Sequence, residues 1–165
     1  MGTDALGRAL PGYEEAGPVK ANRYVGIFYF ITHNNPDVDG PFNVTEIIQE
    51  NPENPQWGSG SHYWGEPEMG YYLNNEEWAI RQHAYLLADV GVDVIILDVT
   101  NNITYQDTYL TICKVFAKMR QEGEQTPDIA FLGSEIWVNK LWYECDSKGS
   151  YEDLWFKWKV TPLLI

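Results

Sequence analysis

An acidic residue and several hydroxyl and amide side chains follow an apolar run near the middle of the chain. The run GVDVIILDVTNN covers residues 91–102, and its last polar members are Asp98, Thr100, Asn101 and Asn102. Asp98 is either a carboxylate that binds ligand hydroxyls or a structural acid that caps a backbone turn. Asn101 and Asn102 either bind hydroxyls or form an Asx turn before the next helix, and the turn role suits Asn102 better.

A second group of polar and aromatic side chains lies in the stretch SHYWGEPEMGYY, residues 61–72. Aromatic faces suit the C–H faces of sugar rings, while carboxylates and other polar groups suit sugar hydroxyls. The stretch therefore predicts a carbohydrate site. The alternative is that its aromatic residues only fasten a long loop to the body of the protein. The side chains concerned are His62, Trp64, Glu66, Glu68, Tyr71 and Tyr72.

Glycoside hydrolysis usually needs two carboxyl groups, about 5 to 9.5 Å apart, on either side of the scissile bond. The catalytic candidates are Glu66, Asp98 and Glu135, with Glu68 nearby, and nothing in the sequence singles out a general acid. No His or Cys spacing matches a metal motif, and no nucleotide-binding glycine motif or G-x-S-x-G elbow is present. We therefore expect no metal and no cofactor.

Alternating apolar strands and amphipathic helices must position these side chains. Near-continuous apolar runs predict strands buried on both faces, and the order strand–helix–strand predicts an α/β fold with a parallel sheet. The predicted strands are 24–31, 92–99, 127–132 and 162–165. The predicted helices are 43–50, 75–90 (capped by Asn74 or Asn75), 105–121, 135–144 and 151–158.

Parallel sheets place their ligands at the carboxyl ends of the strands. His33 follows the first predicted strand, Asp98 and Asn101 follow the second, and Glu135 follows the third. We therefore expect these side chains to lie along one edge of the sheet. His33 and Asn101 are the expected substrate-binding residues there, together with Asp98.

The composition of the chain restricts the classes of molecule that it could bind. The 165 residues carry a formal net charge of −13, and no basic stripe accompanies the aromatic residues. This charge argues against nucleic acid and anionic membranes as partners, and a neutral ligand fits better. No run of about 18 apolar residues suggests membrane insertion, and the first residues lack the apolar centre of a signal peptide. Cys113 lies in a helical pattern and is expected in the core.

The segments YVGIFYF and SHYWGEPEMGYYLNNEEWAIRQHAYLLADVGVDVIILDVTN resemble the amino-terminal half of glycoside hydrolases of the family 71/99-like group. The resemblance covers residues 24–102, with fainter similarity in PDIAFL and WFKWKVTPLLI. It implies a (β/α)8 barrel and an α-glycosidase acting on glycans that contain mannose or glucose. It places His62, Trp64, Tyr71 and Asp98 along the sugar cleft, and it favours a secreted or periplasmic location.

Two features depart from that family. Its catalytic carboxylates lie on later strands than this chain contains, and its W-x-G-K-P-L-L-L ending has Val160 and Thr161 here in place of Gly-Lys. We therefore expect an extended arm at residues 1–22 and a partial barrel domain at residues 23–165, truncated at the fourth strand. Open sheet edges would then favour self-association. The alternatives to a glycosidase are a non-catalytic carbohydrate-binding protein and an open α/β domain of unrelated function.

Overall fold

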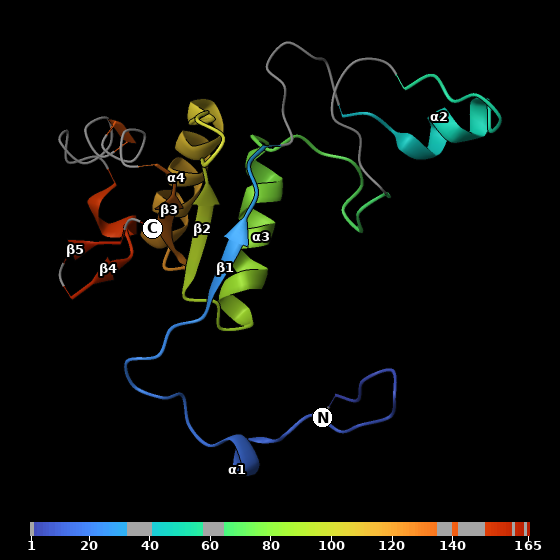
Figure 1. The fold of residues 1–165 in the computed structure, drawn as a ribbon. Helices are drawn as coiled ribbons and strands as arrows, with labels where there is room; N and C mark the ends of the chain where they lie inside the picture. Colours follow the sequence, from blue (N-terminus) through green and yellow to red (C-terminus); the bar gives the residue numbers. More distant parts are fainter. Residues whose placement is uncertain are drawn as a thin grey trace.

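A three-stranded parallel β-sheet forms the centre of the protein in the computed structural model (Figure 1). The structure describes residues 2–32, 41–57, 65–134, 140–141, 151–159, 161–163 and 165. Strands β1 (Gly26–Tyr29), β2 (Val94–Asp98) and β3 (Asp128–Leu132) lie in the order β1-β2-β3. The predicted α/β fold with a parallel sheet is therefore confirmed for these three strands.

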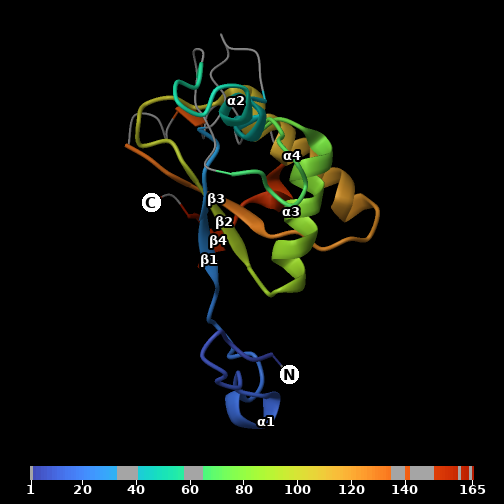
Figure 2. The ribbon, with the colours of Figure 1, turned by 90° about the vertical axis from the view of Figure 1, so that its right-hand side faces the viewer.

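Both crossover helices cover the same face of the sheet (Figure 2). Helix α3 (Glu77–Asp89) joins β1 to β2, and helix α4 (Gln106–Gln121) joins β2 to β3. The sheet residues that pack against these helices alternate along each strand, as the pleat requires. The main core consists of Ile31, Ile95, Leu97, Val99, Ile129 and Phe131 from the sheet side and Ile80, Ala84, Tyr109, Ile112, Cys113, Phe116 and Met119 from the helices.

Strand β1 is not buried on both faces, so that prediction was wrong. Ile27 and Tyr29 pack against the core, whereas Phe28 and Phe30 on the opposite face are each 55% exposed. That opposite face carries only a small second cluster in which Phe156 packs on Val94 and Ala130. The reason is the winding of the chain, because α3 and α4 both lie on one side and no helix of the described residues covers the other side.

The N-cap residues of α3 and α4 make no side-chain capping bond to their helix, whereas a shorter helix is capped by an asparagine. Helix α2 (Val44–Glu50) was predicted, and the side chain of its N-cap residue Asn43 accepts a hydrogen bond from the Glu46 N–H at 3.1 Å. The N-cap of α3 is Glu76 rather than Asn74 or Asn75. A Glu76 carboxylate oxygen accepts from the Leu73 N–H at 3.3 Å, so this longer side chain closes the turn before the helix.

The end of the chain differs from the prediction. Residues 151–158 do not form a helix: the 3₁₀ turn η1 (Glu152–Leu154) is followed by β4 (Lys157–Trp158), which pairs antiparallel with β5 (Thr161–Pro162). Leu154, Trp155 and Phe156 are all buried, and three consecutive buried residues suit an extended segment between two surfaces better than a surface helix.

Within the predicted strand at 162–165, Pro162 belongs to β5, Leu163 lies in no strand, and Ile165 is hydrogen-bonded to β3. The Ile165 N–H donates to the Phe131 carbonyl and the Ile165 carbonyl accepts from the Gly133 N–H, each at 3.0 Å. The Phe156 N–H likewise donates to the Ile129 carbonyl at 2.9 Å. The outer side of β3 is therefore paired at two points, whereas no described strand pairs with the outer side of β1.

The remaining segments are peripheral or largely outside the described residues. Residues 2–22 hold the short helix α1 (Tyr13–Ala16) and a bridge between Thr3 and Ala9, and almost all of them are exposed. Of the predicted helix 135–144, only Lys140 and Leu141 are described, and both are helical. Within the described part of the chain, no helix is both long enough and apolar enough to span a bilayer.

Candidate functional site

The carboxyl ends of the three strands bring one acid next to an apolar surface. Phe28, Ile96 and Ala130 are in register across the sheet, and Asp98 is in register with Leu132 one pleat further on. Ile96 and Asp98 are two positions apart on β2, so their side chains share with Phe28 the face opposite α3 and α4. Asp98 thus lies at the carboxyl end of an apolar sheet face.

Asp98 is held as a carboxylate. Its Oδ1 atom accepts from the Thr100 hydroxyl at 2.7 Å and from the Thr100 N–H at 2.9 Å. The hydroxyl and then the N–H of Thr100 lower the pKa of Asp98 below its usual value. Both turn contacts use Oδ1, so the two interpretations of this residue are compatible: one oxygen shapes the turn while Oδ2 makes none of these contacts. An ionised Asp98 accepts hydrogen bonds and does not donate a proton.

Asn101 has the turn role. Its Oδ1 accepts from the Ile103 N–H at 3.3 Å, and its amide group contacts the Tyr105 hydroxyl. Tyr105 begins α4 with a left-handed backbone, φ 49°. The amide of Asn101 therefore stabilises a tight turn, and its proposed contact with substrate stays a prediction.

Two exposed phenylalanines lie beside this edge, and we call Phe28 and Phe30 the aromatic platform. Their ring centroids are 6.4 Å apart and the rings are inclined by 29°, so they are stacked. Each residue is more than half exposed. The exposed parts of this ring pair offer an apolar contact surface to a ligand.

On the helix-covered face of β1, a histidine lies between two tyrosines, and we call this group the Tyr–His–Tyr chain. The Tyr29 hydroxyl is 2.7 Å from His83 Nδ1, and the Tyr72 hydroxyl is 3.3 Å from His83 Nε2. Burial lowers the pKa of His83, so the imidazole is neutral at pH 7. Burial raises the pKa of Tyr29, with a smaller contribution from Tyr72, and burial also raises the pKa of Tyr72.

A cavity of about 190 Å³ adjoins this chain, and we call it the β1 pocket. Phe28 and Phe30 line it from β1 and the residue that follows β1, and Tyr72, Asn74 and His83 line it from the segment before α3 and from α3 itself. None of the described side chains that line it is charged. Phe28 and Phe30 also line the β1 pocket, so the pocket lies next to the aromatic platform at the outer edge of β1.

The other predicted site residues are less well connected. Glu66 and Glu68 lie in the described part of the loop, where no described contact joins either of them to Asp98. The Tyr71 hydroxyl is 3.3 Å from the Thr45 hydroxyl, which ties its loop to α2. Within the described part of the chain, no three His, Cys, Asp or Glu side chains are grouped to hold a metal ion. The predicted residues that lie outside the described part are His33, His62, Trp64 and Glu135.

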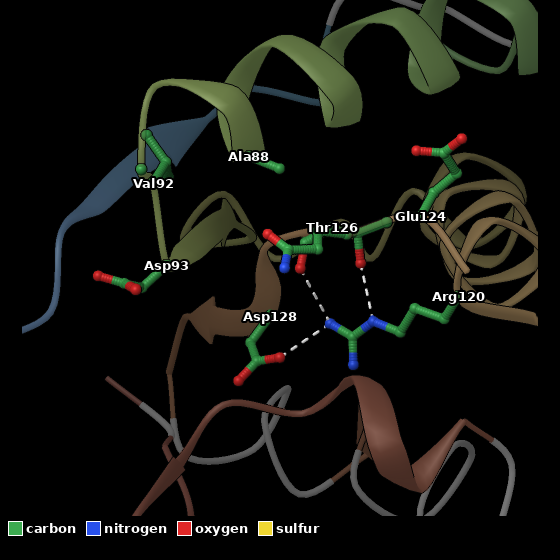
Figure 3. A pocket seen from close by; sticks show the side chains of 9 residues that line it. Ala88, Val92, Asp93, Arg120, Glu124, Thr126 and Asp128 are labelled. Carbon is green, nitrogen blue, oxygen red and sulfur yellow. Dashed lines mark hydrogen bonds and ion pairs between the residues drawn. The ribbon is translucent and has the colours of Figure 1, made fainter.

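A larger cavity, about 450 Å³, lies at the opposite end of the sheet (Figure 3). Arg120 lines this cavity, and its guanidinium group is hydrogen-bonded within the protein. Its Nη2 donates to Asp128 at 2.8 Å and its Nε donates to the Thr126 hydroxyl at 2.8 Å. The Asp93 carboxylate accepts from the Val25 N–H at 2.7 Å. These groups bind one another or the backbone at the amino ends of the strands, where polar residues usually serve stability in α/β proteins.

Sequence reasoning missed the aromatic platform and the Tyr–His–Tyr chain. The signal for the platform is the alternation in YVGIFYFI, which places Gly26, Phe28 and Phe30 on one face and Ile27, Tyr29 and Ile31 on the other. The pairing of Tyr29 with His83 joins residues 54 positions apart, and no local pattern indicates it.

Comparison with known proteins adds no assignment: no protein-family model matches the chain, and neither the curated proteins nor the solved structures contain a significant match. The resemblance to glycoside hydrolases therefore stays a prediction, and the observations that bear on function are those at the carboxyl edge of the sheet.

Proposed function

We propose that the chain binds a neutral oligo- or polysaccharide at the carboxyl edge of its sheet, as the substrate-binding part of a glycoside hydrolase. The observation that carries this proposal is the placement of an ionised Asp98 on the same sheet face as the exposed Phe28 and Phe30 rings. A carboxylate accepts hydrogen bonds from sugar hydroxyls, and aromatic rings stack on the C–H faces of sugar rings.

The winding of the sheet supports the half-barrel that the sequence resemblance implies. Successive parallel strands are neighbours, and both crossover helices lie on one face. This is how strands and helices follow one another in a (β/α)8 barrel, where the helix-free face turns toward the barrel axis. One half of a doubly wound sheet has the same winding, because its helices change face only where the strand order reverses.

The ionisation of Asp98 restricts its chemical role. A carboxyl group that is ionised at neutral pH can act as nucleophile or general base, whereas a general acid must keep its proton. Asp98 is therefore a candidate for the first role. Glu66 and Glu135 remain the candidate partners. A chain that binds sugars without turnover would be a carbohydrate-binding protein, and this alternative follows if neither glutamate completes the pair.

Isothermal titration calorimetry with α-linked manno- and gluco-oligosaccharides tests the proposal. The variant Asp98→Asn keeps the oxygen that accepts in the turn but removes the charge, and a hydrogen bond to a charged group contributes about 1.5–3 kcal/mol. We therefore expect its Kd to rise by at least about tenfold. Asp89→Asn is the matched control, because this exposed residue lies at the far end of α3.

The outcomes separate the alternatives. Binding by the wild type that Asp98→Asn weakens and Asp89→Asn does not supports the proposal. The release of reducing sugar, measured in the same samples, distinguishes a hydrolase from a binding protein. Absence of heat with every oligosaccharide, or equal affinity in all three proteins, would overturn the role of this surface.

A further inference from the structure

The hydrogen atoms of the Tyr–His–Tyr chain can be counted. A neutral imidazole has one N–H and one acceptor nitrogen, and each tyrosine has one O–H. The chain thus holds three donor hydrogens, and its two internal hydrogen bonds, at 2.7 and 3.3 Å, use two of them. One tyrosine hydroxyl must keep a hydrogen that points away from His83.

The burial of the two tyrosines decides which hydroxyl this is. Tyr29 packs against the core, whereas Tyr72 lines the β1 pocket from the segment before α3. A buried hydroxyl without a partner is costly, so the arrangement that satisfies Tyr29 is preferred. The Tyr29 hydroxyl then donates to Nδ1, Nε2–H donates to the Tyr72 oxygen, and the Tyr72 hydroxyl hydrogen is available at the pocket.

The pocket itself restricts the ligand. Its volume of about 190 Å³ is similar to the roughly 150 Å³ of an engineered protein cavity that binds benzene, which is the scale of one small ring. The described lining holds aromatic rings, aliphatic side chains and an amide, and no charged group. Such a lining favours a neutral molecule with an acceptor oxygen and an apolar face, because an ion would be desolvated there without a charged partner.

We infer that the β1 pocket is a subsite for one neutral sugar ring, in which the Tyr72 hydroxyl donates a hydrogen bond to a ring substituent while Tyr29 and His83 position that hydroxyl. The inference rests on the proposed function, since the pocket shares Phe28 and Phe30 with the aromatic platform. A saccharide stacked on the platform extends into the pocket by one further ring.

The test compares affinities for a series from mono- to tetrasaccharide of the best-binding sugar, in the wild type and in Tyr72→Phe. This substitution keeps the ring and removes only the hydroxyl, which corresponds to about a fivefold loss of affinity for one neutral hydrogen bond. We expect this loss for ligands long enough to reach the pocket, and unchanged affinity for shorter ones. Tyr85→Phe, at an exposed tyrosine of α3, is the matched control and leaves the whole series unchanged.

A second measurement separates this role from a purely structural one. The ¹⁵N chemical shifts of the His83 ring report which nitrogen carries the proton, and the inference requires Nε2–H. An Nδ1–H tautomer would overturn it, because the available hydroxyl hydrogen would then belong to Tyr29.

The two proposals fail differently. If Asp98→Asn weakens binding but Tyr72→Phe matches Tyr85→Phe at every ligand length, the subsite is wrong and the proposed function stands. If the wild type binds no saccharide, both are wrong. Circular dichroism of Tyr72→Phe establishes that the variant is folded, so that a loss of affinity reflects the lost hydroxyl.

Discussion

Replacement of Arg120 by methionine should destabilise the protein more than the loss of any other described ion pair. Arg120 lies in the last turn of α4, and its guanidinium group connects that helix to the start of β3 and to η1 (Figure 3). It donates to the Thr126 hydroxyl and to Asp128 Oδ1, each at 2.8 Å, and to the carbonyl of Pro127 at 3.1 Å. A further bond reaches the Asp153 carbonyl. Methionine retains much of the aliphatic packing and none of these donors.

The magnitude follows from the partial burial of the pair. The Arg120 and Asp128 side chains are 28% and 38% exposed. An exposed ion pair contributes about 0.2–1 kcal/mol, and breaking a buried pair on one side costs about 3–5 kcal/mol. The cost of breaking this partly buried pair should lie between these two values. The carbonyl and hydroxyl acceptors that lose a charged donor add to the cost. We expect a loss of about 2–4 kcal/mol in the free energy of unfolding, which lowers Tm by about 4–16 °C for a domain of this size.

Urea unfolding, followed by tryptophan fluorescence and by circular dichroism, measures this loss. Arg81→Met is the matched control, because the Arg81–Glu122 pair is more exposed, 42% and 41%, and should cost less than about 1 kcal/mol. Equal losses in the two variants would refute the structural role of Arg120. Below its Tm, Arg120→Met should bind saccharides as the wild type does, because Arg120 lies at the opposite end of the sheet from Asp98.

Two further predictions concern the core and the buried histidine. Because burial lowers the pKa of His83, its imidazole is protonated at a higher pH in the unfolded chain than in the folded protein. The free energy of unfolding should therefore be highest above about pH 6.5 and decline below it. Urea titrations at about pH 7.5 and 5.5 should show a smaller decline in His83→Gln than in the wild type. An equal decline of the free energy of unfolding in His83→Gln and in the wild type would assign the pH dependence to other groups. Phe131→Ala should lower the free energy of unfolding by about 3–5 kcal/mol, since its buried ring contacts Tyr109 and Trp155. Phe28→Ala should lower it by about 1 kcal/mol or less, because the Phe28 ring is largely in water. Similar losses in the two variants, measured by urea unfolding, would contradict the observed burial.

The elements with strong periodicity could be predicted from the sequence. Helices α3 and α4 each bury a continuous stripe, and β2 and β3 are short apolar runs that end at polar residues. Their bounds agree with the predicted ranges to within about two residues at each end, as expected when patterns are local. The burial of Cys113 in α4 is confirmed for the same reason.

Features that depend on long-range pairing could not be predicted in this way. The run at 24–31 has the pattern of a strand buried on both faces, but burial depends on what covers the sheet, and no helix covers the Phe28 side. Residues 151–158 were predicted to be helical from their own composition. The hydrogen bond from the Phe156 N–H to the Ile129 carbonyl instead holds this segment extended against β3, and its partner lies 27 positions earlier in the chain.

The two ends of the sheet differ in how their polar groups are used, and this difference is the strongest reason to place function at the carboxyl edge. At the amino end, Arg120, Asp128 and Asp93 bind groups of the protein itself, so a ligand there would have to break bonds that hold the fold. At the carboxyl end, Asp98 makes its turn contacts through one oxygen, and the hydrogen count leaves one tyrosine O–H directed away from His83. Larger volume at the amino end does not outweigh this, because recognition requires polar groups that can exchange water for a ligand without a loss of stability.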